Sequence, residues 1–186
     1  DRETDLFEGL WELPRGVAYN AYFINDEKCA IIDTIKADKL SAYMERLVSI
    51  MPEGRSIDYL VVNHMEPDHS GSISILRKLY PEMKILGNKK TLEMIGAFYG
   101  ITEGLVEVKE GDVIDLGRHK LTFAMIPMVH WPESMVAYET TEKVLFSTDA
   151  FGGFCALEGG IFDDELDMAL YEDETLRYFA NIVGRY

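Results

Sequence analysis

Apolar and polar residues follow two different periods along this chain, one typical of helices and one typical of strands. Between positions 37 and 51 the apolar residues recur every three or four positions, as on the buried face of an amphipathic helix. Similar stripes predict helices over 71–80, 90–99 and 173–183. Gly100 directly follows the predicted helix 90–99, and glycine commonly ends a helix because it accepts the left-handed conformation.

Short apolar runs, separated by turn residues, predict strands between these helices. The predicted strands are 17–24, 29–32, 59–63, 84–86, 106–108, 113–116, 121–126, 135–138 and 144–146. Residues 1–16 show no regular pattern. This mixture of strands, hairpins and helices indicates an α/β (α+β) fold, with two sheets packed together and helices outside them.

Composition narrows the class of protein. With 186 residues and 47% apolar content, we expect one globular domain over 1–186. The net charge of −15 argues against a nucleic acid or an anionic membrane as partner, since both need a basic face. No apolar run reaches the length of a membrane span, and no signal-peptide pattern opens the chain. Two cysteines, Cys29 and Cys155, form no disulfide framework, so we expect a reducing, cytoplasmic location.

Potential metal ligands are concentrated directly after the predicted strand 59–63. The segment His64-Met65-Glu66-Pro67-Asp68-His69 holds two of the four histidines of the chain. His130 and Asp149 each follow another apolar run, and strand ends are common places for functional residues. Imidazole and carboxylate groups at three strand ends predict a metal site, although residues 68–70 could instead cap the next helix.

The pattern His-x-Glu-x-Asp-His, followed by His130 and then Asp149, resembles the diiron site of flavodiiron proteins. Segments 19–22, 31–34, 130–135 and 149–152 are also similar to that family. The resemblance implies the metallo-β-lactamase fold, an αββα sandwich, here incomplete. Hydrolytic zinc members of the fold generally have histidine at the position of Glu66, which makes the motif specific.

The resemblance also implies how two irons would be held. One would be bound by His64, Glu66 and His130, the other by Asp68 and His69, with Asp149 bridging the two; His69 is the least secure of these ligands. Mixed nitrogen and oxygen donors suit iron, manganese or zinc. The negative charge of Glu66 would favour ferric iron and lower the reduction potential. Trp131 could form a dry wall beside the site or simply pack in the core.

Members of this family reduce oxygen to water, or nitric oxide to nitrous oxide, with electrons relayed through FMN. The resemblance therefore predicts an oxidoreductase with two iron ions and, in the full-length protein, FMN. It also implies a head-to-tail homodimer, with rubredoxin or a flavin reductase as electron donor.

The chain departs from the family in two respects. No histidine follows Asp149, although the family has a further iron ligand there, and no flavodoxin-like segment is present. Because 178–186 resembles mid-domain sequence, we expect a fragment of a longer protein that is inactive alone. The alternatives are a flavin-free diiron oxygen sensor, a zinc hydrolase of the same fold, or a structural fragment without metal.

Overall fold

The computed structural model describes residues 1–184, and its contacts divide the chain into two compact units. Unit 2 runs from Asn20 to Thr148, whereas unit 1 combines residues 1–19 with the chain from Asp149 onward. The prediction of a single domain over 1–186 stays a prediction. The last two residues of the predicted mid-domain segment 178–186 lie outside the described residues.

Unit 2 contains a five-stranded sheet in the order β3-β4-β5-β6-β7. Its strands are β3 (Tyr22–Ile24), β4 (Ala30–Ile32), β5 (Tyr59–Val61), β6 (Lys84–Gly87) and β7 (Leu105–Glu107). The pair β3–β4 is antiparallel and is joined by a short turn, while β4 to β7 are parallel. Parallel neighbours need long crossovers, and the helices of unit 2 supply them.

The second sheet of unit 2 is antiparallel, with the order β11-β10-β9-β8. Its strands are β8 (Val113–Asp115), β9 (Lys120–Met125), β10 (Met135–Glu139) and β11 (Val144–Phe146). Every predicted strand from 106 to 146 is therefore present, with ends shifted by one residue or less from most predicted bounds.

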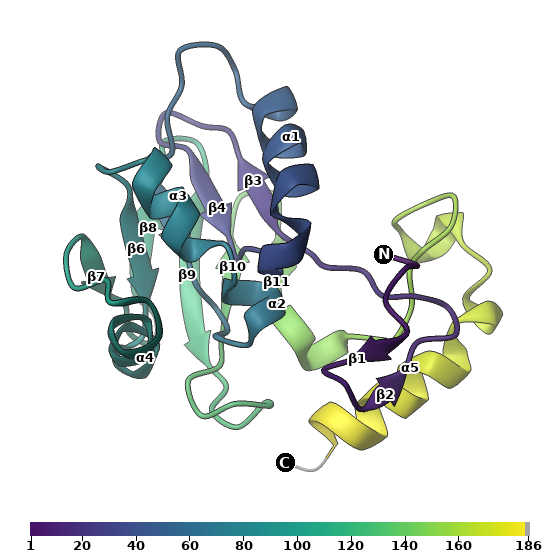
Figure 1. Cartoon of the computed structure of the whole chain (residues 1–186). Coiled ribbons are helices and arrows are strands. Elements are labelled where there is room, and N and C mark those ends of the chain that lie inside the picture. The colour runs from purple at the N-terminus through teal and green to yellow at the C-terminus, as the bar shows by residue number, and fades with distance from the viewer. Residues whose placement is uncertain (185–186) are drawn as a thin grey trace. The chain divides into compact units, whose positions relative to one another are not determined.

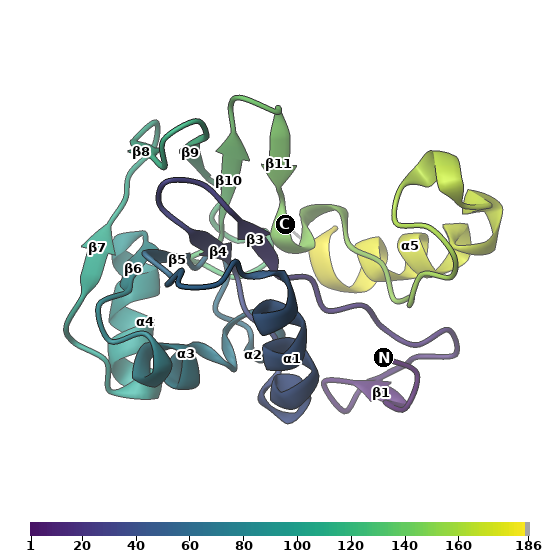
Figure 2. The same cartoon turned by 90° about the horizontal axis from the view of Figure 1, so that it is seen from above.

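The first sheet is buried on both faces, which explains its nearly continuous apolar strands. Ile31 belongs to the core shared with the helices, whereas its neighbour Ile32 belongs to the core between the sheets. Figures 1 and 2 show the resulting layers of unit 2: the antiparallel sheet, the parallel sheet, and then the helices α1, α3 and α4. The mixed α/β prediction is confirmed, and within this unit the helices cover one side of the sandwich.

The helices of unit 2 are α1 (Leu40–Ile50), α2 (Pro67–Ser70), α3 (Ile73–Leu79) and α4 (Lys89–Tyr99). A 3-10 turn, Ala37–Lys39, leads into α1, so the predicted helix over 37–51 is confirmed apart from its ends. The Asn88 side chain caps α4 by accepting from the Thr91 N–H, and Gly100 ends it with a φ of 67°. The short helix α2 was not predicted.

Unit 1 is built from a two-stranded hairpin, β1 (Leu6–Phe7) and β2 (Trp11–Glu12), and the helix α5 (Glu172–Tyr178). A π-helical turn, Phe179–Val183, continues α5. Phe154 is fully buried and packs against the rings of Phe7, Trp11 and Tyr178. The hairpin falls in the stretch predicted to be irregular, because two-residue strands are too short to show alternation.

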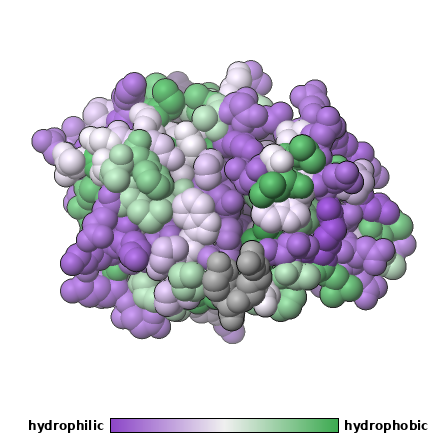
Figure 3. All heavy atoms as spheres, turned by 60° about the horizontal axis from the view of Figure 1, so that its bottom comes forward, coloured by the Kyte–Doolittle hydropathy of each residue, from purple (hydrophilic) through white to green (hydrophobic). Residues whose placement is uncertain are grey.

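The two cysteines, Cys29 and Cys155, are buried free thiols. None of the helices formed by residues 1–184 has the length and apolar composition that a bilayer span requires. On the face drawn in Figure 3, hydrophilic residues separate the apolar side chains into patches.

Candidate metal centre

The first candidate ligands lie on the loop between β5 and α2. His64 is the third residue after β5, and Glu66 directly precedes Pro67, the first residue of α2. The buried Asp33 fixes the start of this loop, because its Oδ1 accepts a hydrogen bond of 2.7 Å from the Asn63 N–H. Asp33 has a φ of 56°. This contact joins the end of β4 to the end of β5 and sets the position from which His64 projects.

His130 comes from a second loop, between β9 and β10. The Ile126 N–H donates to the Ser134 carbonyl at 3.0 Å, and the Met128 N–H donates to the Trp131 carbonyl at 2.8 Å. These bonds close the loop tightly. The side chain of His130, which this loop carries, is 11% exposed.

Three donor atoms from the two loops meet in one cluster. His64 Nε2 lies 3.3 Å from both Glu66 Oε2 and His130 Nε2, and His130 Nε2 lies 2.8 Å from Glu66 Oε2. Metal–ligand bonds of about 2.0–2.2 Å place neighbouring donors of one ion about 3.0–3.5 Å apart. The triangle therefore has the size of one face of a coordination shell. Two imidazoles and one carboxylate on a single face form the donor set of non-haem iron sites, so these residues fit iron.

Asp68 and His69 lie on α2, and both are largely buried. His69 Nε2 is 3.7 Å from Asp68 Oδ2, and its Nδ1 is 3.8 Å from Asp33 Oδ2. The His64 and His69 rings are 5.2 Å apart between centroids. The structure thus places the second predicted pair beside the first cluster.

Asp149, the sixth predicted ligand, is the first residue of unit 1. It lies in a 3-10 helix, Thr148–Phe151, and is 8% exposed. Only Ser147 and Thr148 separate it from the end of β11 in unit 2. Its assignment as a ligand stays a prediction.

Glu133 is the residue near the cluster that the sequence analysis did not single out. It is 1% exposed, and its Oε1 accepts hydrogen bonds from the Met65 N–H at 2.8 Å and from His64 Nδ1 at 2.9 Å. Burial raises the pKa of this carboxyl, but the His64 ring and the Met65 N–H outweigh burial and hold that pKa below its usual range. Its position three residues after His130 was the only signal in the sequence.

Trp131 packs against both a candidate ligand and the core, and its role as a dry wall stays a prediction. Its indole ring packs edge-on against the His64 ring, with centroids 5.3 Å apart. The same side chain packs against the core between the first sheet and the helices. Trp131 therefore borders the cluster on its apolar side.

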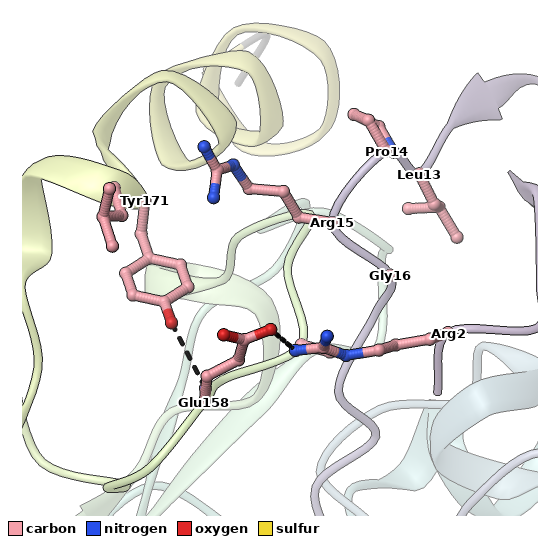
Figure 4. Close-up of a pocket in the computed structure, with 9 residues that line it drawn as sticks. Arg2, Leu13, Pro14, Arg15, Gly16, Glu158 and Tyr171 are labelled. Carbon is pink, nitrogen blue, oxygen red and sulfur yellow. Dashed lines mark hydrogen bonds and ion pairs between the residues drawn. The ribbon is translucent and has the colours of Figure 1, made fainter.

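A separate cavity of about 240 Å³ lies within unit 1 (Figure 4). Arg2 and Arg15 line it together with Glu158 and Tyr171. Arg2 pairs with Glu158, whose N–H donates to the Tyr171 hydroxyl at 3.2 Å. With two arginines and a single carboxylate in its lining, this cavity offers no cluster of metal ligands.

The sequence and the fold of this chain are both similar to those of known proteins. A model described as "ODP family beta lactamase" matches residues 17–175. The anaerobic nitric oxide reductase flavorubredoxin of Vibrio vulnificus is 37% identical over 187 residues, an alignment that covers 98% of this chain and 37% of that protein. This chain spans about two fifths of the length of the curated relatives it matches.

Solved structures agree in fold. The flavodiiron protein from Giardia intestinalis superposes with a TM-score of 0.91 at 30% identity, over 99% of this chain and 44% of that one. The rubredoxin oxygen:oxidoreductase from Desulfovibrio gigas gives 0.89 at 34% identity, over 95% and 44%. These matches confirm the predicted metallo-β-lactamase type of fold and the resemblance to flavodiiron proteins.

Proposed function

The chain belongs to the ODP family of beta-lactamase-like domains, and from this membership we propose that it is the diiron part of a flavodiiron oxidoreductase. The whole protein would reduce oxygen to water, nitric oxide to nitrous oxide, or both. The observation that carries this proposal is the cluster of two imidazole nitrogens and one carboxylate oxygen within 3.3 Å of one another. A hydrolytic zinc site of this fold would have histidine in place of Glu66.

The proposed ligand set has two halves. His64, Glu66 and His130 would hold one iron, and Asp68 with His69 would contribute to the second. Asp149 would bridge the two ions. A carboxylate is suited to the bridging place because its two oxygens can each reach one ion.

Residues at the site would influence the reactivity of the two irons. Each bound ferrous ion can supply one electron to oxygen or nitric oxide. The charge of Glu66 would stabilise the ferric state and lower the reduction potential. The Trp131 ring, edge-on to His64, would keep bulk water away from one side of the cluster.

The remaining partners belong to the proposal for the whole protein. Relatives are named flavorubredoxin and rubredoxin oxygen:oxidoreductase. By extension, FMN would relay electrons from rubredoxin or a flavin reductase, in a head-to-tail homodimer located in the cytoplasm. Nothing in this part of the proposal involves nucleic acid or a membrane.

A single-turnover reaction tests the function without the flavin. The chain is loaded with two equivalents of ferrous iron under anaerobic conditions and mixed with nitric oxide. Two nitric oxide molecules, two electrons and two protons give one nitrous oxide and one water, so we expect about one nitrous oxide per chain by gas chromatography. Zinc-loaded protein and the Glu66→Ala variant are the controls and should give none. Two bound ferrous irons that neither give nitrous oxide from nitric oxide nor become oxidised by oxygen would contradict the proposal.

A further inference from the structure

We propose that Glu133 is a positioning residue that fixes His64 in the tautomer whose Nε2 lone pair faces His130 and Glu66. The inference deepens the proposed function and rests on it in one respect, namely that His64 is a metal ligand. It assigns a role to a buried carboxylate that the ligand pattern does not include.

His64 has a carboxylate oxygen near each ring nitrogen, and the shorter contact, 2.9 Å at Nδ1 against 3.3 Å at Nε2, determines which nitrogen carries the proton. Glu133 Oε1 lies 2.8 Å from the Met65 backbone nitrogen and 2.9 Å from His64 Nδ1. The backbone N–H can only donate, so Oε1 is already an acceptor there. An ionised carboxylate has no proton to give, and therefore Nδ1 must donate as well. In a neutral imidazole with Nδ1–H, Nε2 keeps its lone pair.

The lone pair of His64 Nε2 faces the other two potential metal ligands. His64 Nε2 is 3.3 Å from His130 Nε2 and 3.3 Å from Glu66 Oε2. The opposite tautomer would direct an N–H at this point and leave Nδ1 facing the carboxylate without a proton. A carboxylate behind a metal-binding histidine thus selects the tautomer that can bind and makes the ring a stronger donor.

Glu133 is itself held by neighbouring elements. Its carbonyl accepts a hydrogen bond of 2.6 Å from the Asn88 side chain, the residue that also caps α4. Two residues later, the Met135 N–H donates to the Asn63 carbonyl at 3.0 Å, just before His64. The Glu133 backbone is therefore tied to α4 and to the loop that carries His64, so its side chain has a defined direction.

Charge explains why glutamate, and not glutamine, fits the position. Glu133 Oε2 is buried and has no hydrogen-bond partner within residues 1–184. A glutamine that kept its carbonyl at Oε1 would face His64 Nδ1 with a neutral acceptor, which forms a weaker hydrogen bond than a carboxylate does. Glu133→Gln should therefore preserve the tautomer of His64 but weaken the support behind it.

The test compares Glu133→Ala and Glu133→Gln with the unaltered chain. Glu139 supplies the matched control, because it is also buried and accepts backbone N–H groups from Thr141 and Glu142, but it contacts no histidine. Long-range ¹H–¹⁵N NMR of the metal-free chain at about pH 8 reports the tautomer of His64. Anaerobic titration with ferrous iron gives the affinity of each variant.

We expect the unaltered chain, Glu133→Gln and Glu139→Gln to show Nδ1–H on His64, and Glu133→Ala to show both tautomers. Ferrous affinity should fall about 10- to 100-fold in Glu133→Ala and by less in Glu133→Gln, with Glu139→Gln unchanged. A merely structural role at the Met65 amide would leave the tautomer unaltered. Unchanged tautomer and affinity in a folded Glu133→Ala variant would overturn the inference. An unaltered chain that binds no ferrous iron would overturn the proposed function, while the NMR comparison would still decide the role of Glu133.

Discussion

At the scale of single residues, Asp26 connects the two sheets of unit 2 at the edge away from the ligand loops. It lies in the turn between β3 and β4. Its Oδ2 accepts bonds of 2.7 Å and 2.8 Å from the N–H and the Nδ1 of His119, in the turn between β8 and β9. Its Oδ1 accepts from the Arg118 and Glu27 N–H groups. Burial raises the pKa of Asp26, but these hydrogen bonds outweigh it and hold that pKa well below its usual range.

We predict that Asp26→Asn lowers the free energy of unfolding at pH 7 by about 1–3 kcal/mol, since an NH₂ group would face the donors of His119. Because the folded pKa of Asp26 is depressed, its contribution is complete above about pH 4, the ordinary pKa of aspartate, and is lost as the pH falls further. Urea unfolding at pH 7 and pH 3 should therefore show a difference between the two proteins that narrows at pH 3. Glu27→Gln is the control, expected to change stability by about 0.5 kcal/mol or less. A gap as large at pH 3 as at pH 7 would refute this assignment.

His119 also shows where inference from the sequence stops. It lies in a turn, where surface residues are common, yet its side chain is only 18% exposed and is bonded to Asp26. Glu133 was overlooked for the same reason. In each case the partner is distant in sequence, so the contact exists only after the sheets have packed. The ligand residues could be predicted from the sequence because histidine, glutamate and aspartate are themselves typical metal ligands.

At the scale of elements, the helix ends follow local rules that the sequence carries. Gly100 ends α4 in the left-handed conformation, and a Cβ added there would meet no atom within 4 Å. Gly96, inside the same helix, would place its Cβ 3.7 Å from the Ile101 carbonyl oxygen, an ordinary contact. The two positions therefore separate backbone strain from helix propensity.

Gly100→Ala should destabilise the chain by about 1–2 kcal/mol, because only the backbone conformation opposes the methyl group. Gly96→Ala should stabilise it by about 0.5–1 kcal/mol, since alanine loses less entropy than glycine inside a helix. Thermal unfolding of both variants, monitored by circular dichroism, measures these changes. Equal effects of the same sign at the two sites would show that α4 does not end at Gly100 as described.

The elements that escaped prediction are the short ones. The strands β1 and β2 have two residues each, and α2 has four. They are too short to show the alternation of a strand or the three- to four-residue repeat of a helix in the sequence. The predicted helix over 71–80 is α3, which begins only at Ile73. Gly71 lies between the two helices, where a Cβ would come within 2.6 Å of the Pro67 carbonyl oxygen. Close backbone packing of this kind leaves no hydrophobic pattern.

At the scale of the whole molecule, the division into two units is the feature least visible in the sequence. Unit 1 is assembled from both ends of the described chain, as the 5.6 Å separation of the Phe7 and Phe154 ring centroids illustrates. No shift in composition marks the boundary between Thr148 and Asp149. The three clustered donors, by contrast, all lie in unit 2, within one continuous segment of the chain.

Metal loading should therefore stabilise the folded chain. An ion that binds the folded state alone adds about 2.7 kcal/mol at a free concentration of one hundred times its Kd. We expect ferrous iron to raise the urea midpoint of the unaltered chain under anaerobic conditions, and chelation to reverse the shift. His130→Ala removes one of three donors and should lose most of the effect. Equal stabilisation of both proteins would place the iron elsewhere.

The central claim is that His64, Glu66 and His130 bind iron together. Crystals of the iron-loaded chain, measured on both sides of the iron absorption edge, test it most directly. The account predicts an anomalous peak about 2.0–2.2 Å from His64 Nε2, His130 Nε2 and a Glu66 carboxyl oxygen. Ordered side chains at these three positions with no iron between them would contradict it.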